Sequence, residues 1–185
     1  MTKRVLVPLA QGCEELEAVT IIDLLTRAGV DVVSASLDDS RTIIASRGVQ
    51  LVAQTTLADV ESDTFDVIAL PGGMPGANHL NEDARLHRML RQTVQQGGLS
   101  AAICAAPKVL VSAGLLDGKK ATSFPGVIEQ QPAENMTFVD EAVVQDGQVV
   151  TSKGPGTAIP FALTLIENLL GQDKRHEVES GLQLS

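Results

Sequence analysis

Apolar runs and amphipathic stretches follow one another along nearly the whole chain. Runs with the length and composition of buried strands are found at 4–10, 30–37, 65–70 and 99–103. Helical periodicity is found at 14–29, 83–96, 105–113, 157–170 and 174–184. This alternation predicts an α/β fold in which one open, mostly parallel sheet carries helices on both faces.

Shorter β-prone segments interrupt this alternation. Residues 42–54 hold two such runs around Ser46-Arg47-Gly48, which predicts a hairpin, and a second hairpin is expected around Asp146-Gly147. Residues 120–123 suit a short strand. We find no linker, internal repeat or low-complexity segment, so a single domain over residues 1–185 is expected.

The first helix carries acidic residues at its start. Glu14, Glu15 and Glu17 complement the positive end of the helix dipole, and by default they form a solvated first turn. The positions Leu16, Val19, Ile22 or Asp23, and Thr26 share one face of this helix, which Gly29 ends.

Composition and charge exclude several classes of protein. The 185 residues are 44% hydrophobic, carry a formal net charge of −9 and include no Trp or Tyr. Such a chain repels a phosphate backbone and has few rings to stack on bases, so direct nucleic-acid binding is not expected. No apolar run approaches the roughly 18 residues of a membrane span, and no secretory signal is visible. A cytoplasmic protein is therefore expected.

The cysteines and histidines show no metal-binding pattern. Cys13 and Cys104 are interpreted as thiols rather than as a disulfide. His79, His87 and His176 have no ligand spacing with either cysteine. We therefore expect neither a metal nor a cofactor.

Cys104 lies where a buried strand passes into a helix. The strand Leu-Ser-Ala-Ala-Ile precedes it, and the small residues and Pro107 that follow suit a first helical turn. Free backbone NH groups and the helix dipole would lower the thiol pKa from its free value of about 8.5 and make a reactive thiolate. The alternative is an inert buried cysteine, the usual state of a free thiol.

Ligands of parallel sheets bind at the carboxyl ends of the strands. Three segments that follow predicted strands are therefore candidates for a ligand site: residues 12–17, 71–76 and 104–107. Gly72 and Gly73 let the backbone approach a bound group, and the NH groups of Gly73 and Ala105 could form an oxyanion hole. The alternative is an ordinary turn. The loop around Pro155 could likewise border a site, or it could be an ordinary tight turn in which Thr157 caps the next helix.

Several motifs in order resemble one family. They are Gly-Cys-Glu-Glu-Leu-Glu-Ala-Val, Ser-Arg-Gly-Val, Leu-Pro-Gly-Gly, Ala-Ala-Ile-Cys-Ala-Ala-Pro and Lys-Gly-Pro-Gly-Thr-Ala. Together they resemble the ThiJ/PfpI superfamily, and within it the branch of the protein deglycases. The resemblance extends over nearly the whole chain.

The resemblance implies a flavodoxin-like three-layer sandwich of the class I glutamine-amidotransferase type, and a homodimer. It implies Cys104 as the nucleophile, with Glu17 beside it. An ionised carboxylate would raise the thiol pKa, so Glu17 is expected to be protonated and to donate a hydrogen bond to the thiolate. The pocket and anion-binding positions that it implies are Glu14, Arg27, Arg47, Gly72 and Pro155.

Two positions depart from the wider superfamily. Many members have a histidine where this chain has Phe124, and without a positioned base, protease or amidotransferase chemistry is not expected. Cys13 is not the usual residue at its position. It is either a small residue that fits a tight turn or a resolving thiol for Cys104.

The leading hypothesis for function is a cofactor-independent deglycase or glyoxalase that acts on methylglyoxal, glyoxal or their adducts on proteins and nucleotides, and so protects against carbonyl and oxidative stress. Cys104 would attack the aldehyde-level carbon, and a hydroxy acid would be released. The alternative is a redox-sensing chaperone in which Cys104 is oxidised to a sulfinate. Thiazole monophosphate biosynthesis, an old label of the family, ranks last.

Overall fold

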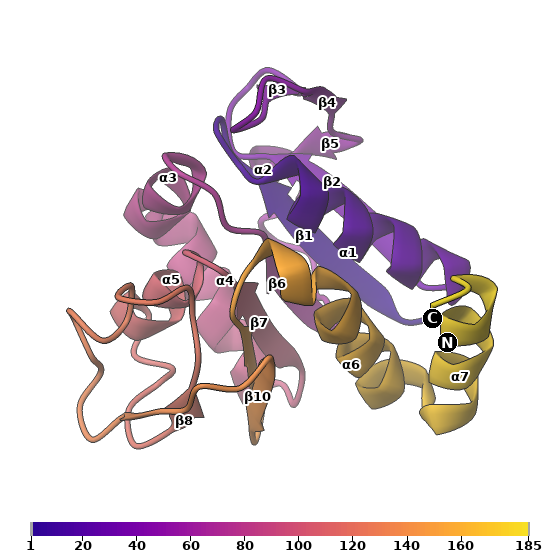
Figure 1. Cartoon of the computed structure of the whole chain (residues 1–185). Coiled ribbons are helices and arrows are strands. Elements are labelled where there is room, and N and C mark those ends of the chain that lie inside the picture. Colours follow the sequence, from indigo (N-terminus) through magenta and orange to yellow (C-terminus); the bar gives the residue numbers. More distant parts are fainter. Residues whose placement is uncertain (1, 185) are drawn as a thin grey trace.

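A seven-stranded sheet forms the centre of the molecule (Figure 1). The computed structural model describes residues 2–184. The strand order is β10-β11-β7-β6-β1-β2-β5, and every neighbouring pair is parallel except β10 with β11. The strands are β1 (Arg4–Leu9), β2 (Asp31–Ser36), β5 (Thr55–Thr56), β6 (Val67–Leu70), β7 (Leu99–Ile103), β10 (Val143–Asp146) and β11 (Val149–Ser152).

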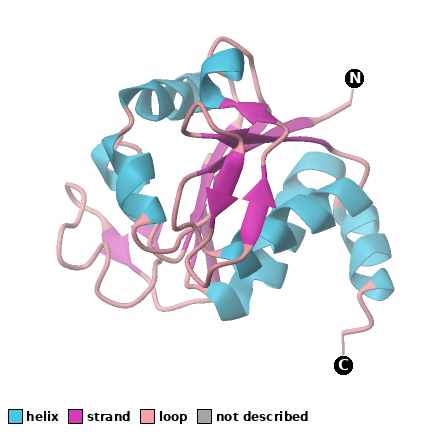
Figure 2. Cartoon of the chain, turned by 90° about the horizontal axis from the view of Figure 1, so that it is seen from above, coloured by secondary structure: helices cyan, strands magenta, loops and turns pink. Residues whose placement is uncertain are grey.

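Helices cover both faces of this sheet (Figure 2). One layer holds α1 (Glu15–Arg27), α6 (Ala158–Leu170) and α7 (Gln172–Gly181). The other holds α2 (Leu57–Val60), α3 (Gly76–Glu82), α4 (Ala84–Gln95) and α5 (Pro107–Ser112). Small additions are the hairpin β3 (Thr42–Ile44) with β4 (Gln50–Val52), the pair β8 (Lys120–Ala121) with β9 (Thr137–Phe138), and a 3₁₀ turn at Pro155–Thr157.

The sheet has an apolar core on each side because strand residues alternate between the two faces. On β1, Val5 and Val7 belong to the core beneath α1 and α6, whereas Leu6 belongs to the core beneath α4 and α5. These strand positions are fully buried. Burial on both faces explains why the central strands are continuous apolar runs in the sequence.

The predicted α/β sandwich with a mostly parallel sheet is confirmed, and so is the hairpin at 42–54. Three details differ. The short helices α2 and α3 were not expected, residues 122–123 are not part of β8, and α5 begins at Pro107 rather than at Ala105. The last difference matters because it places two turn residues between Cys104 and the helix.

The buried face of α1 is not the one expected above from Leu16, Val19 and Thr26. Leu16 and Val19 are about half exposed, whereas Glu17, Ala18 and Ile21 are fully buried. The helix packs its other face against β1 and α6 because Glu17 is held by the loop after β6. The buried residues Ala18, Ile21 and Leu25 also recur at helical spacing, so the face expected from Leu16, Val19 and Thr26 is the wrong apolar stripe of this helix.

Within residues 2–184, no helix combines the length and apolar character that crossing a membrane requires.

A substitution in α4 tests the packing of the second core. Leu90 is fully buried, whereas Gln92 on the same helix is exposed. Leu90→Ala should lower the free energy of unfolding by about 2–5 kcal/mol, because it leaves a cavity. Gln92→Ala should change it by less than about 0.5 kcal/mol. Urea denaturation measures both, and equal losses would contradict this packing.

Candidate active site

Cys104 lies at a sharp turn after β7, at the carboxyl end of the sheet. Its φ is +64°, in the left-handed region that non-glycine residues rarely adopt. Two backbone hydrogen bonds hold it there: Cys104 N donates to Ser152 O at 2.9 Å, and Phe124 N donates to Cys104 O at 2.8 Å. The turn thus presents the thiol at the edge of the core, where the residue is 9% exposed.

Glu17 approaches the thiol from the first turn of α1. Its Oε2 accepts a hydrogen bond of 2.7 Å from Gly72 N, in the turn after β6. Its Oε1 is buried and has no hydrogen-bond partner among residues 2–184, and the Cys104 thiol lies near enough to this carboxyl to affect its pKa. A buried carboxylate oxygen without a donor is costly. A proton on Oε1, donated to the sulfur, would satisfy it.

Burial raises the pKa of Glu17 to about 7, and the nearby charge of Glu14 adds to this. The hydrogen bond from Gly72 N and the interaction with the Cys104 thiol act in the opposite direction. Glu17 can therefore hold a proton near neutral pH, as the sequence analysis expects.

The pKa of Cys104 is raised to about 12, chiefly by burial and then by the charge of Glu17. The backbone NH groups of Gly73 and Ala105 lower it in part. The expectation that a helix end lowers this pKa is wrong, because α5 begins three residues later and has only six residues. Thiol and carboxyl titrate as a pair, and the pair loses its first proton near pH 7.

Close packing fixes the relative positions of the two turns. A Cβ atom added at Gly72 would lie 2.7 Å from Cys104 Cβ and 2.9 Å from Ala105 N. Gly72 is therefore required by space, and its own amide is used by Glu17. The backbone NH groups of Gly73 and Ala105 lie close enough to the sulfur to lower the pKa of the thiol. These are the two groups predicted to form an oxyanion hole.

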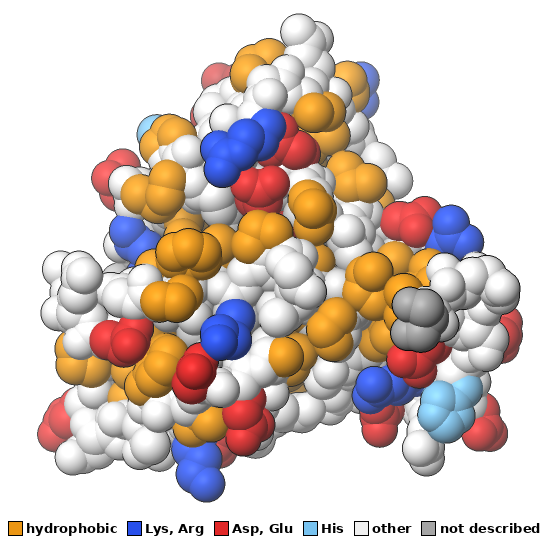
Figure 3. All heavy atoms as spheres, in the orientation of Figure 1, with side chains coloured by type: hydrophobic (Ala, Val, Ile, Leu, Met, Phe, Trp, Pro, Cys, Tyr) orange, Lys and Arg blue, Asp and Glu red, His pale blue; other side chains and the backbone are white. Residues whose placement is uncertain are grey.

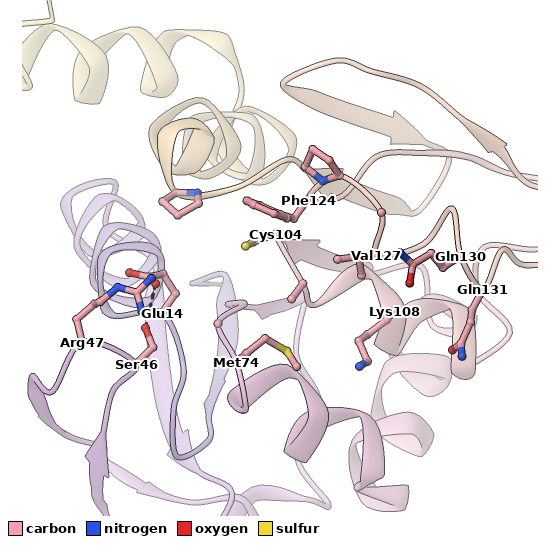
Figure 4. A pocket seen from close by; sticks show the side chains of 15 residues that line it. Glu14, Ser46, Arg47, Met74, Cys104, Lys108, Phe124, Val127, Gln130 and Gln131 are labelled. Atoms are coloured by element: carbon pink, nitrogen blue, oxygen red, sulfur yellow. Dashed lines mark hydrogen bonds between the residues drawn. The ribbon is translucent and has the colours of Figure 1, made fainter.

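A cavity of about 590 Å³ opens over Cys104 (Figure 4). The predicted positions Glu14, Arg47 and Pro155 line it together with Gly73, Cys104 and Ala105. The other lining residues are not among the predicted site positions: they are Ser46, Met74, Lys108, Phe124, Pro125, Gly126, Val127, Gln130 and Gln131.

The acidic start of α1 is buried rather than solvated. Ser46 Oγ donates to Glu14 and to Glu15, at 3.0 Å each, and Arg47 N donates to Glu15 at 2.8 Å. Burial would raise the pKa of Glu15, but these hydrogen bonds lower it overall. The acidic residues therefore attach the β3–β4 hairpin to α1 and place Arg47 beside the pocket.

Arg27 does not line the cavity. It is the last residue of α1, roughly 18 Å along the helix from Glu15, and it forms an exposed ion pair with Asp23 at 2.7 Å. Cys13 is fully buried, and its pKa is raised to about 12 by burial and by Glu15. Unlike Cys104, Cys13 does not line the cavity, which favours the structural interpretation of Cys13.

The model of the DJ-1/PfpI family matches residues 3–168. The chain belongs to the DJ-1/PfpI family. The resemblance drawn from the sequence motifs is thereby confirmed.

DJ-1/PfpI relatives match over most of the chain. Protein dj-1beta of Drosophila melanogaster is 46% identical over 183 residues, covering 98% of this chain and 97% of that protein. Protein DJ-1 homolog A of Arabidopsis thaliana is also 46% identical over 99% of this chain, which spans only 47% of that longer relative. A protein of Caenorhabditis elegans named glutathione-independent glyoxalase DJR-1.2 is 35% identical, covering 95% of this chain and 92% of that protein.

Solved structures of the DJ-1/PfpI family agree with the fold. The crystal structure of Drosophila melanogaster DJ-1beta has a TM-score of 0.95 at 45% identity, and each chain is covered completely. A structure of oxidised Toxoplasma gondii DJ-1 has a TM-score of 0.94 at 44% identity, again with complete coverage of both.

Lys108 lies outside the family motifs, and Phe124 was named only because it replaces a histidine of the wider superfamily, not as a residue of the pocket. Lys108 follows Pro107 in the first turn of α5, and Phe124 lies in the loop after β8. Lys108 is a cation four residues after the candidate nucleophile, and this spacing could have indicated a pocket residue from the sequence. The loop that carries Phe124 has no periodicity from which its position could be predicted.

The titration of the pair can be followed through the alkylation of Cys104. Below pH 7 both groups hold their protons, and above it one proton is lost from the pair. The rate of reaction with iodoacetamide should therefore rise through an apparent pKa near 7 and then level off. In Glu17→Gln the inflection near 7 should disappear, because the thiol then titrates alone.

Cys104→Ser is the control, and it should react slowly because Cys13 is fully buried. A wild-type profile that rises steadily beyond pH 9 without an inflection near 7 would contradict the coupling.

Proposed function

We propose that this chain is a cofactor-independent enzyme that converts 2-oxoaldehydes such as methylglyoxal and glyoxal, or their adducts on thiols and amines, into hydroxy acids. One observation carries the proposal. The Cys104 residue and the backbone of Gly73 and Ala105 line an open cavity, and the Glu17 carboxyl lies buried behind them, close to the thiol. The name of the Caenorhabditis elegans relative, a glutathione-independent glyoxalase, supports the same chemistry.

The first step uses the pair in its singly protonated state. With the proton on Glu17, the Cys104 thiolate attacks the aldehyde carbon and forms a C–S bond, and the carbonyl π electrons move to oxygen. The NH groups of Gly73 and Ala105 stabilise this oxyanion, which then takes the proton from Glu17. The product is a neutral hemithioacetal, and Glu17 is left ionised.

The second step is an internal oxidation and reduction. Ionised Glu17 removes the hydrogen of the hemithioacetal carbon as a proton, and the electron pair forms an enediolate whose charge lies on the oxygen of the neighbouring carbonyl. The hydroxyl proton of the first carbon passes to that oxygen, and Glu17 returns the removed proton to the second carbon. The second carbon is thereby reduced to an alcohol, while the first carbon becomes a thioester carbonyl. Water then hydrolyses the thioester, releasing the hydroxy acid and restoring the thiol. No external oxidant or reductant is needed.

The raised pKa of Glu17 suits both roles, because a group with a pKa of about 7 can give and take a proton near neutral pH. An adduct on an amine or thiol enters the same sequence when Cys104 displaces that group. Deglycase and glyoxalase activities therefore need the same residues. The alternative role as a redox-sensing chaperone also depends on Cys104, and it stays a prediction.

Two substitutions test the proposed chemistry with methylglyoxal and with its hemithioacetals. Cys104→Ser should lower kcat/KM at least about 10³-fold, since the serine hydroxyl lacks a strong base. Glu17→Gln should lower it about 10²–10⁴-fold, because the proton acceptor is lost. Lactate is measured by chromatography, and Cys13→Ser serves as a thiol control of near wild-type activity. Lactate formation by Cys104→Ser at the wild-type rate would contradict the proposal.

The assembly that we propose is a homodimer built on the outward face of α1 and on the β3–β4 hairpin. The two elements adjoin, because Ser46 binds Glu14 and Glu15. Together they expose hydrophobic side chains, visible over this part of the surface in Figure 3. These are Leu16, Val19, Ile44, Val49 and Val52. A second copy related by a twofold axis would cover the same residues on both chains.

Light scattering after size exclusion tests this dimer. The wild type should show twice the 19.4 kDa mass of the chain. Leu16→Glu combined with Val19→Glu should give the monomer mass, since the interface would bury uncompensated charges. Gln92→Glu, on the other face of the sheet, should leave the mass unchanged. A monomeric wild type at 100 µM would refute the assembly.

A further inference from the structure

The cavity over Cys104 has a second charged side that the proposed chemistry does not use. In Figure 4, Arg47 lies on one side of Cys104, and Lys108 lies on the other with Gln130 and Gln131. Glu17, the sulfur and the amides of Gly73 and Ala105 account for every bond made and broken. The Lys108 side is therefore free to bind a part of the substrate that does not react.

Lys108 has no acidic partner. Its ammonium group donates one hydrogen bond, to the neutral amide oxygen of Asn78 in α3, and it forms no ion pair within residues 2–184. An ammonium group has three N–H donors, so two remain. The side chain is half-buried and lines the cavity. By contrast, Lys153 and Lys174 are paired with acids on the surface.

The cavity lining has a positive net charge, whereas the whole chain has a negative one. The protein carries 23 acidic and 14 basic residues. The cavity lining contains two cations, Arg47 and Lys108, and one acid, Glu14, which accepts a hydrogen bond from Ser46. No acidic residue lines the side that holds Lys108. This local excess of positive charge favours an anionic group there.

Two amide side chains line the cavity on the same side as Lys108. Gln130 and Gln131 are exposed, lie in the loop between β8 and β9, and line the cavity with Lys108. Primary amides donate hydrogen bonds without adding charge. A lysine with two neighbouring amides can therefore hold a carboxylate or a phosphate oxygen, while the sulfur reacts a few bonds away.

We propose that Lys108, assisted by Gln130 and Gln131, is a specificity-determining residue that binds an anionic group on the carrier part of the substrate. The preferred substrates are then 2-oxoaldehyde adducts on small thiols or amines that also bear a carboxylate or phosphate. This inference rests on the proposed function. Lys108 positions the substrate and takes no part in proton transfer.

Two matched probes test the preference. The hemithioacetal of methylglyoxal with N-acetylcysteine is anionic, whereas that with N-acetylcysteine amide is neutral. In the wild type, KM should be about tenfold lower for the anionic probe, the value of one charge-assisted hydrogen bond. Lys108→Met should remove this difference by raising KM for the anionic probe alone. The neutral probe and free methylglyoxal should keep their wild-type kcat and KM.

Two further variants separate charge from structure. Lys108→Arg should keep most of the preference, and Lys174→Met, which removes a surface lysine of α7, should keep all of it. Equal losses for both probes in Lys108→Met, or an unchanged preference, would overturn the role of Lys108.

A binding measurement keeps this inference separate from the proposed function. The unreactive thioethers S-(2-hydroxypropyl)-N-acetylcysteine and its amide can be titrated by calorimetry into Cys104→Ser and into Cys104→Ser with Lys108→Met. The acid should bind more tightly than the amide only when Lys108 is present. If the wild type forms no lactate yet this difference is found, the proposed reaction fails and the anion subsite stands. If lactate forms without this difference, the subsite alone fails.

Discussion

The contact between the Cys104 thiol and the Glu17 carboxyl is the interaction on which the site depends. Both groups become negative when they lose a proton, and both are largely shielded from water. Such a pair retains one shared proton over a wide pH range. The amide of Gly72 favours the charge on Glu17, whereas those of Gly73 and Ala105 favour it on sulfur. With a pKa of about 7, Glu17 ionises before Cys104, whose pKa is about 12, so the reactive thiolate forms when the thiol proton passes to the Glu17 carboxylate.

The fold brings this pair together from segments that are far apart in the sequence. Glu17 comes from the start of α1, the glycines follow β6, and Cys104 follows β7. All three lie at the carboxyl ends of neighbouring parallel strands, where open α/β sheets bind their ligands. The left-handed backbone of Cys104 costs free energy of order 1–3 kcal/mol. Its hydrogen bonds to Ser152 and Phe124 hold that conformation.

Much of this architecture could be predicted from the sequence, because buried parallel strands are continuous apolar runs and Cys104 directly follows one. The helix α3 could not be predicted, since Gly76, Asn78 and His79 are weak helix formers without an apolar stripe. Nor could the inward face of α1, because the helix has two apolar stripes, one with Leu16 and Val19 and one with Ala18 and Ile21, and only the fold determines that the second is buried. The pKa of Cys104 was predicted in the wrong direction. A helix start is visible in sequence, but burial and the distance to an acid are set only by the fold.

The distribution of charge limits how the cavity can select its substrates. A net charge of −9 gives the molecule a field that repels anions at long range. Salt screens this field over about 8 Å at physiological ionic strength, whereas a direct hydrogen bond to a half-buried cation is screened much less. Arg47 and Lys108 therefore act on a molecule only after it has entered the cavity. Selection for anionic substrates would thus appear in KM and in dissociation, rather than in a faster rate of encounter.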